Sequence, residues 1–416
     1  MVPSFEREIE VERLDSGLLF CRLANRQAPI ATTVLAYRAG CRDEPAGGGG
    51  TAHFLEHMMF KGSARFAAGE IDRRTQALGG QNNAFTSHDT TAYYFTFAAD
   101  RWGEGLTIES DRMAGLTLEA REVASERQVI GEEIAMYRDD PWDTLELEVL
   151  AALFGDHPYA RPVLGTPEEL ARVGREELAA FHRRFYRPDN AVLVVAGDVG
   201  GEARDRARAA FPARAEPLLP RPELPGVSPP RGTVRVERRH GEVARLLFAF
   251  PAPPPDSAEH GRLRLLATAL ASGRASRLQR ALVEDGELCL GVSASLLDNS
   301  RASAFTIGAE LLPGVEPERV EAAIRDELAR LAAGPLSDEE HERARRVHLA
   351  DWIFQHERIH QQALTVALAL AEFDLEAPER LLAAALEVGP EELALLAARW
   401  LDPRASAVVG VSRVES

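Results

Sequence analysis

The pattern of hydrophobic and polar positions predicts both strands and helices in the first half of the chain. β-Branched and aromatic residues are concentrated in three segments, which predicts strands; these are Ile30–Tyr37, Thr90–Ala98 and Leu193–Ala196. Apolar residues recur at steps of three and four in five segments, which predicts helices; these are Ala52–Phe60, Glu70–Leu78, Trp102–Gly115, Glu119–Tyr137 and Glu168–Phe185. Because strands and helices are interleaved, we expect an α+β fold in which a sheet packs against helices.

Part of this pattern occurs twice. The segment Val173–Phe185 aligns without gaps on Val388–Trp400, 215 positions later, and seven of the thirteen residues are identical. The same offset places the apolar run Ala191–Ala196 on Ser406–Val411. Each copy is typical of an amphipathic helix, a turn and a buried strand, which suggests an internal duplication. Chance similarity of two helix-to-strand joints in an Ala/Glu-rich chain is the alternative.

Prolines accumulate near the middle of the chain, between Phe211 and Gly232. Proline interrupts helices and central strands, and such a stretch is typical of a semi-rigid linker. We therefore expect two homologous α+β domains, at residues 1–211 and 233–416, joined by a Pro-rich linker at residues 212–232.

Composition and charge narrow the class of protein. The 416 residues are 45% hydrophobic and carry 48 Lys+Arg against 65 Asp+Glu, a formal net charge of −17. This is typical of a globular protein of two or more domains, and the acidic balance argues against a nucleic-acid partner. The three cysteines have no ligand-like spacing, so we expect no disulfide framework and no thiolate zinc cluster. The segment Met1–Leu14 has no signal-peptide pattern and no later run is apolar enough to span a membrane, which predicts a cytoplasmic protein.

The sequence His53-Phe-Leu-Glu56-His57 is an H-x-x-E-H motif. On a helix, His53 and His57 lie one turn apart and Glu56 lies on the same side. Two imidazoles from one turn suit a zinc ion, and the glutamate between them can hold water at the metal. A catalytic zinc site also requires a third protein ligand.

A second histidine pair forms His356-Glu357-Arg-Ile-His360, which matches the H-E-x-x-H motif of thermolysin-like zincins. Arg358 and several glutamines surround this motif, which is more typical of a solvated helix face. A distal ligand could come only from Glu372 or Glu376. The zincin interpretation is therefore the weaker alternative.

The segment Gly50–Gly62 resembles the signature of the insulinase/pitrilysin family of zinc peptidases, which includes the mitochondrial processing peptidase. The resemblance continues in three further blocks, at Gly80–Tyr94, Ser125–Ile134 and Phe185–Asn190, and becomes weak in the second half. It implies two homologous α+β domains joined by a linker, a Zn²⁺ cofactor and peptide hydrolysis.

The resemblance also implies the third ligand. In the family this ligand is a glutamate about 76 residues past the second histidine, which corresponds to Glu133. Glu126 lies seven positions earlier on the same helix face, and we expect it to orient a ligating histidine through a hydrogen bond. Glu132 is the alternative ligand.

The same resemblance assigns roles around the metal. Glu56 is the expected general base, which takes a proton from water and passes it to the leaving amine. The segment Asn82–Ser87 resembles the edge strand on which family members bind an extended substrate, so Asn83, Ala84 and Thr86 are expected to contact substrate. We expect His88 and Asp89 to close the following loop and not to bind metal.

The second half departs from the family pattern. Members that are active alone carry an arginine followed seven residues later by a tyrosine, and Val283 and Leu290 occupy these positions here. Neither side chain can donate a hydrogen bond to substrate. We therefore expect a homologous partner subunit that carries the Arg/Tyr pair, with a homodimer possible when the chain is alone.

Three classes of function remain for comparison. The leading hypothesis is a zinc endopeptidase that acts on unfolded or short peptides, as the catalytic subunit of a heterodimer. A catalytically silent scaffold or core subunit of the same fold is the alternative, and it would not need the complete ligand set. A binding protein with a structural zinc is disfavoured because such sites are closed and usually contain cysteine.

Overall fold

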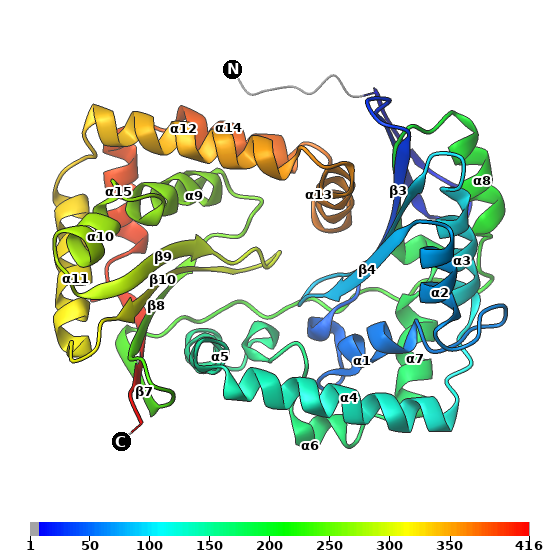
Figure 1. The fold of residues 1–416 in the computed structure, drawn as a ribbon, viewed down its shortest axis with the longest axis horizontal. Coiled ribbons are helices and arrows are strands. Elements are labelled where there is room, and N and C mark those ends of the chain that lie inside the picture. Colours follow the sequence, from blue (N-terminus) through cyan, green and yellow to red (C-terminus); the bar gives the residue numbers. More distant parts are fainter. Residues whose placement is uncertain (1–7, 416) are drawn as a thin grey trace.

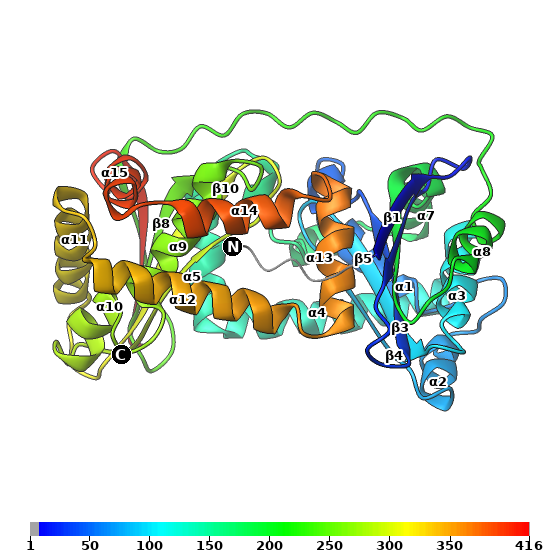
Figure 2. The same ribbon diagram turned by 90° about the horizontal axis from the view of Figure 1, so that it is seen from above.

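The computed structural model describes residues 8–415, in which two similar halves lie side by side (Figure 1). Each half contains one mixed sheet with helices packed against it. Residues 212–231 contain neither helix nor strand and run as an extended connection along one side of the molecule (Figure 2). Among the described residues, no helix combines the length and the hydropathy needed to cross a bilayer.

The first sheet has six strands in the order β1-β2-β6-β3-β5-β4. Neighbouring strands are antiparallel except for β2 and β6, which are parallel. The strands are β1 (Glu8–Arg13), β2 (Leu19–Ala24), β3 (Ile30–Tyr37), β4 (Gln81–Thr86), β5 (Thr91–Ala98) and β6 (Ala191–Gly197). All residues of β6 are buried, as expected for a central strand that is covered on both faces. β4 lies at the edge of the sheet.

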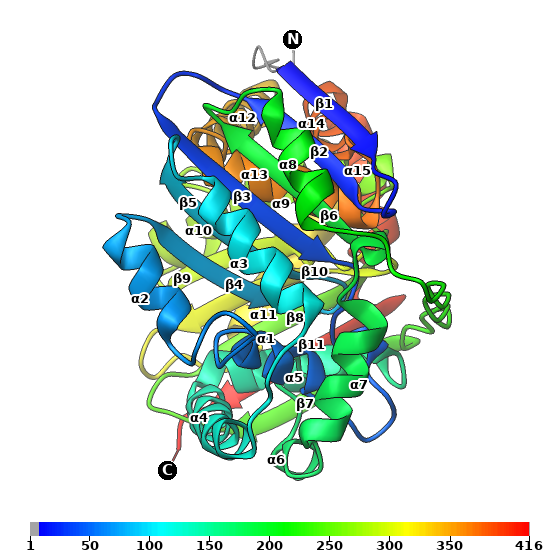
Figure 3. The ribbon, with the colours of Figure 1, turned by 90° about the vertical axis from the view of Figure 1, so that its right-hand side faces the viewer.

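Helices of the first half cover one face of this sheet (Figure 3). They bury aromatic and aliphatic side chains such as Phe54, Leu106 and Phe181 against the strands. The helices of residues 8–211 are α1 (Thr51–Met58), α2 (Glu70–Ala77), α3 (Gly103–Ala114), α4 (Ala120–Asp139), α5 (Pro141–Phe154), α6 (Pro167–Leu170), α7 (Arg175–Phe185) and α8 (Glu202–Ala210), with 3₁₀ turns η1 (Cys41–Asp43), η2 (Pro158–Ala160) and η3 (Pro188–Asn190).

The second half repeats most of this plan with a sheet in the order β7-β11-β8-β10-β9. The strands are β7 (Gly232–Arg239), β8 (Arg245–Ala252), β9 (Cys289–Leu296), β10 (Ser303–Leu311) and β11 (Ser406–Arg413). β11 is parallel to β7 and antiparallel to β8, as β6 is to β2 and β3. The helices are α9 (Ala258–Ala271), α10 (Arg277–Gln279), the π-helix η4 (Arg280–Glu284), α11 (Pro317–Ala333), α12 (Asp338–Gln355), α13 (Ile359–Glu372), α14 (Ala377–Glu387) and α15 (Pro390–Trp400).

The other face of each sheet is covered by a helix from the opposite half. α13 packs on β3 and β6 of the first sheet, where Ala363, Val366 and Leu370 contact strand residues such as Val194. α5 packs on β8 and β11 of the second sheet, where its Val149 lies in one cluster with residues of both strands. The two halves therefore share their cores, although each has a sheet of its own (Figure 1).

Most predicted elements agree with the structure, and the helix α7 and strand β6 recur as α15 and β11. The prediction of one helix over Glu168–Phe185 is wrong, because the chain turns between α6 and α7. Gly174 has an extended conformation there, and its N–H donates to the Glu177 carboxylate, which starts a new helix. α5 was not predicted, although Asp140 followed by Pro141 is a typical helix start; the Asp140 carboxylate accepts from the N–H groups of Trp142 and Asp143.

We expect α13 to stabilise the whole chain through its contact with the first sheet. Leu370 is 6% exposed in that contact, so Leu370→Ala should lower the free energy of unfolding by about 2–5 kcal/mol, as core truncations do. Leu395→Ala is the matched control, because Leu395 is 70% exposed on α15 and its truncation should change stability by less than about 0.5 kcal/mol. Chemical denaturation measures both. Equal effects of the two substitutions would contradict the shared core.

Candidate metal and catalytic site

α1 carries both histidines of the H-x-x-E-H motif and is held firmly at its start. Gly50, the residue before the helix, has a φ of 83°, and a Cβ there would lie 2.4 Å from the Leu164 carbonyl oxygen. The Glu44 carboxylate accepts hydrogen bonds from the N–H groups of Gly50 and Ala52, as acidic groups at a helix N-terminus commonly do. This attachment sets where His53 and His57 project.

Glu133 on α4 completes a group of three possible metal ligands. Its Oε2 lies 3.7 Å from Nε2 of His53 and 3.6 Å from Nε2 of His57. Among the described residues, this is the one group of three or more His, Cys, Asp or Glu side chains in which the ligand atoms lie within 4.8 Å of one another. The neighbouring Glu132 is exposed and does not belong to it.

These separations fit a shared zinc ion. They are too long for hydrogen bonds. Zinc–ligand bonds of about 2.0–2.1 Å at tetrahedral angles place two ligand atoms about 3.4 Å apart, close to the separations in the structure. The residues present therefore suit a tetrahedral site with two imidazoles, one carboxylate and one open position.

Glu126 fixes the orientation of His57. Its Oε1 lies 2.8 Å from Nδ1 of His57, so the imidazole donates from Nδ1 and turns Nε2 toward Glu133. The other oxygen of Glu126 forms an ion pair of 2.7 Å with Lys61. The predicted role of Glu126 thus has the expected geometry. Lys61 was not singled out in the sequence, and only its place four residues after His57 pointed to this surface of α1.

Glu56 projects from the same helix and contacts β4. The Thr86 hydroxyl donates to Oε2 of Glu56 over 2.6 Å. Sequence reasoning expected Thr86 to contact substrate, but in the structure its hydroxyl holds the candidate general base.

Burial and neighbouring charges shift the pKa values in this group. Burial lowers the pKa of His53 to about 4, and nearby His57 adds to this effect, so His53 is a neutral imidazole at neutral pH, the form that ligates metals. Burial also opposes the protonation of His57, but the hydrogen bond and charge of Glu126 and the charges of Glu133 and Glu56 raise its pKa. Burial raises the pKa of Glu56, which favours proton acceptance from water.

The group opens into a cavity of about 620 Å³. Ala84, Phe85 and Thr86 of β4 form part of its lining, whereas Asn83 does not. Asn83 is exposed, and its side chain accepts a hydrogen bond from the Ala84 N–H. α5, which was missed in the sequence, supplies another wall through Asp143, Glu146, Leu147 and Leu150. The position of α5 is set by its packing on the second sheet. The local sequence therefore does not indicate that α5 lies beside this cavity.

The second histidine motif does not form a comparable group. His356 follows the last residue of α12, and His360 belongs to α13. Because the helix is interrupted between them, the two imidazoles cannot project from one helical turn, so the structural premise of the zincin interpretation is wrong. His356 is buried against Trp352, and the His360 ring stacks on Tyr94. The expectation of a solvated face is also wrong for His356 and Gln362, which are both buried.

Two family models match successive parts of the chain. The model described as "Insulinase (Peptidase family M16)" matches residues 21–167, and "Peptidase M16 inactive domain" matches residues 172–347. An uncharacterized zinc protease of Mycobacterium leprae is 35% identical over 314 residues, which are 72% of this chain and 68% of that protein. The chain belongs to the insulinase (M16) family of peptidases. The zinc protease PqqE of Helicobacter pylori is 27% identical over 337 residues, 80% of this chain and 76% of that protein.

Solved structures of M16 proteins share the fold. A protease from Helicobacter pylori has a TM-score of 0.92 at 23% identity and covers 98% of this chain and 100% of its own. A peptidase M16 inactive domain from Pseudomonas fluorescens has a TM-score of 0.87 at 18% identity and covers 98% of each chain. The expected α+β fold with two similar halves is confirmed.

We expect this M16 chain to bind one zinc ion per molecule. His53→Ala, His57→Ala and Glu133→Ala should each abolish stoichiometric zinc binding, because each removes one of three ligands. Glu132→Ala is the matched control on the same helix and should retain the metal. Metal analysis after gel filtration measures the zinc content. If Glu132→Ala lost zinc and Glu133→Ala retained it, Glu132 would be the third ligand in place of Glu133.

Proposed function

We propose that this chain is a zinc endopeptidase that hydrolyses unfolded or short peptides. One observation carries the proposal: His53, His57 and Glu133 present ligand atoms at separations that suit a shared cation, with Glu56 beside them at a cavity. The relatives named zinc protease support the same reaction class.

In this mechanism His53, His57 and Glu133 hold the zinc ion. When bound, zinc supplies a Lewis acid that acidifies water and polarises a peptide carbonyl. The chain's own residues do the remaining work. The Thr86 hydroxyl donates a hydrogen bond to Oε2 of Glu56. The other oxygen, Oε1, accepts the proton of the attacking water. Glu56 then delivers this proton to the leaving amine. Glu126 keeps the His57 ring in its ligating orientation.

The edge strand β4 supports extended peptides as substrates. β4 pairs only with β5 in the described sheet, so its other edge can accept a further strand. The Ala84 N–H in β4 donates a hydrogen bond to the Asn83 side chain. A substrate carbonyl oxygen would take the place of the Asn83 side chain as the acceptor. Asn83 and Ala84 thus keep their proposed role in substrate binding. A peptide must be extended to pair in this way, which favours unfolded substrates, and we place the protein in the cytoplasm as the sequence predicts.

A catalytically silent scaffold of the same family is the second candidate. A chain without catalytic activity has no need of two histidines and a third possible ligand in one cavity. It also has no need of the Glu56 carboxylate, hydrogen-bonded to Thr86, beside them. The complete set therefore favours the enzyme.

Glu56→Gln separates metal binding from catalysis. The amide cannot accept the proton of water, so hydrolysis of a fluorogenic peptide should fall by a factor of about 10² to 10⁴, while zinc content stays at one per chain. Chelation should abolish the wild-type activity, and added zinc should restore it. His360→Ala is the control and should leave both quantities unchanged. Undiminished hydrolysis by Glu56→Gln would exclude Glu56 as the base.

We further propose that this chain is the zinc-bearing member of a two-subunit enzyme. Val283 lies in η4 and packs on the second core, and Leu290 is 54% exposed at the start of β9. β9 then runs toward the first half, where the loop that follows it meets the β4–β5 turn. Neither the Val283 nor the Leu290 side chain can donate a hydrogen bond to a developing oxyanion, which supports the supply of these donors by a homologous partner.

The isolated chain should therefore bind zinc and fold but hydrolyse peptides weakly. Mixing it with a homologous chain that carries the Arg/Tyr pair and lacks H-x-x-E-H should raise kcat/KM by at least about tenfold, because one lost oxyanion donor commonly costs 10² or more. Titration of activity against partner concentration measures the effect, with the partner's Arg→Ala and Tyr→Phe variants as controls. Full activity of the chain alone, unchanged by any partner, would exclude this arrangement and leave a self-sufficient enzyme.

A further inference from the structure

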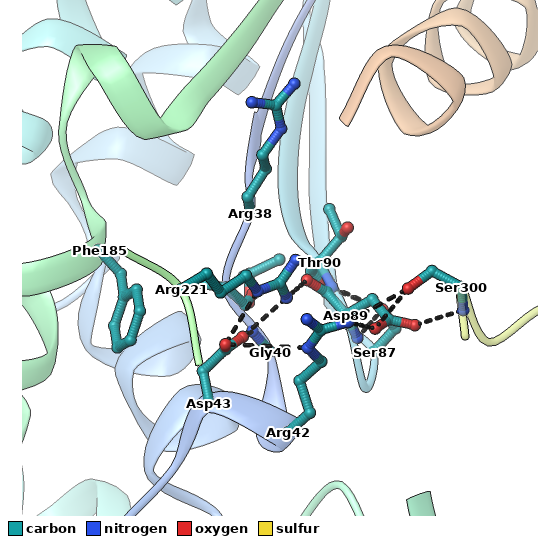
Figure 4. Close-up of polar contacts among 12 residues, drawn as sticks. Arg38, Gly40, Arg42, Asp43, Ser87, Asp89, Thr90, Phe185, Arg221 and Ser300 are labelled. Carbon is teal, nitrogen blue, oxygen red and sulfur yellow. Dashed lines mark hydrogen bonds and ion pairs between the residues drawn. The ribbon is translucent and has the colours of Figure 1, made fainter. Parts of the chain in front are cut away.

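The turn between β4 and β5, residues 87–90, is held by three separate parts of the chain (Figure 4). From the first half, the N–H groups of Cys41 and Arg42 donate to the carbonyl oxygens of Ser87 and His88. The linker and the second half make the other contacts, through side chains that are buried or nearly so. This turn directly follows Thr86, the residue that holds Glu56.

The Asp89 carboxylate is the centre of these contacts. It accepts hydrogen bonds from Arg42 Nη1 at 2.7 Å and from the Tyr159 hydroxyl at 2.8 Å. It also accepts from the N–H and the hydroxyl of Ser300, at 2.8 and 2.9 Å. Ser300 lies in the β9–β10 loop, so Asp89 joins the turn directly to the second half. Burial opposes its charge, but these donors hold the pKa of Asp89 below its usual value.

Arg221 of the linker reinforces the same turn. Its guanidinium donates to both carboxylate oxygens of Asp43, at 2.9 and 2.8 Å, and to the Asp89 carbonyl oxygen at 2.5 Å. It also forms an ion pair with Glu372 at the end of α13, and Glu372 accepts a hydrogen bond from Thr90. The helix that the second half places on the first sheet is thus tied to the same four residues.

The position of the turn determines the position of Thr86. Thr86 is the last residue of β4 and pairs with Thr91, whose hydroxyl donates to the Ala39 carbonyl oxygen. A displaced turn would move the Thr86 hydroxyl away from Glu56, which it contacts over 2.6 Å. Misplacement of a reacting group by about 1 Å can cost as much as 10²-fold in rate.

We propose that Asp89 is a positioning residue, which acts through Thr86 on the orientation of the Glu56 carboxylate and makes that orientation depend on the docked β9–β10 loop. The proposal rests on the peptidase function proposed above. It assigns no contact between Asp89 and substrate or metal.

Asp89→Asn in the full-length, zinc-loaded chain tests the proposal. The amide keeps the shape of the side chain but loses its charge and part of its acceptor capacity. We expect kcat to fall by about 10- to 100-fold, KM to change by less than about twofold, and zinc content to stay at one per chain. Asp298→Asn is the matched control: Asp298 lies in the same β9–β10 loop but accepts from His260 and Arg264 of the second half, so kcat should stay unchanged. Ser300→Ala, a milder change, should lower kcat less than Asp89→Asn.

A double-substitution cycle distinguishes positioning from general stability. Thr86→Val should lower kcat, and Thr86→Ser should retain activity because the hydroxyl remains. If Asp89 acts through Thr86, Asp89→Asn should cause little further loss in the Thr86→Val background. Additive losses, or a parallel loss of zinc and folded protein in Asp89→Asn and Ser300→Ala, would overturn the proposal.

Hydrogen exchange gives a readout that needs no activity. Amides of β4 and the 87–90 turn should exchange faster in Asp89→Asn than in the wild type or in Asp298→Asn, while α1 stays protected. Unchanged exchange at β4 would overturn the proposal. If the zinc-loaded wild type hydrolyses no peptide, with or without a partner, the proposed function fails, and the exchange experiment still decides whether Asp89 holds the strand.

Discussion

Each of the two sheets has apolar side chains on both faces, and the chain covers the second face of each with a helix from the opposite half. α13 does this for the first sheet and α5 for the second. Without this exchange of helices between the halves, residues such as Val194 and Val408 would face water, at a cost of about 25 cal/mol for each Å² of apolar surface. The candidate site depends on this constraint, because α4 and α5 run from the candidate metal ligand Glu133 to the second sheet.

The exchange also explains where the cavity lies. Its walls come from α1 and β4 on one side and from α4 and α5 on the other. The polar contacts of Asp89 and Arg221 add a second connection between the halves next to the same cavity. Buried charges of this kind require complete hydrogen bonding, and such networks are sensitive to small displacements. The candidate site thus lies next to polar contacts that join the two halves.

Charge within the site is a further constraint. Glu56, Glu126 and Glu133 surround two imidazoles in a partly buried space. Like charges at these distances raise the pKa of carboxylates and destabilise the folded chain unless cations compensate them. Lys61 compensates Glu126 through its ion pair, and a bound Zn²⁺ would compensate Glu133. The ligand set, rather than the fold, is what distinguishes an M16 peptidase from a silent member.

Local sequence determined the features that depend on neighbours along the chain. The four-residue spacing of His53 and His57 placed both on one helix face, and the apolar runs predicted β3 and β6. The 215-residue offset predicted that a helix, a turn and a buried strand recur in the second half. Glu133 and Glu126 lie beside the two histidines in the structure, and the sequence indicated this proximity only because a family resemblance supplied the separation to Glu133 and helix spacing added Glu126. Only the tertiary structure decided that Thr86 contacts Glu56, that α5 and α13 each pack on the sheet of the opposite half, and that one helix does not contain both His356 and His360. The physical reason is that these features depend on where a helix ends and on which distant surface covers an apolar face, and both are decided by packing of the whole chain.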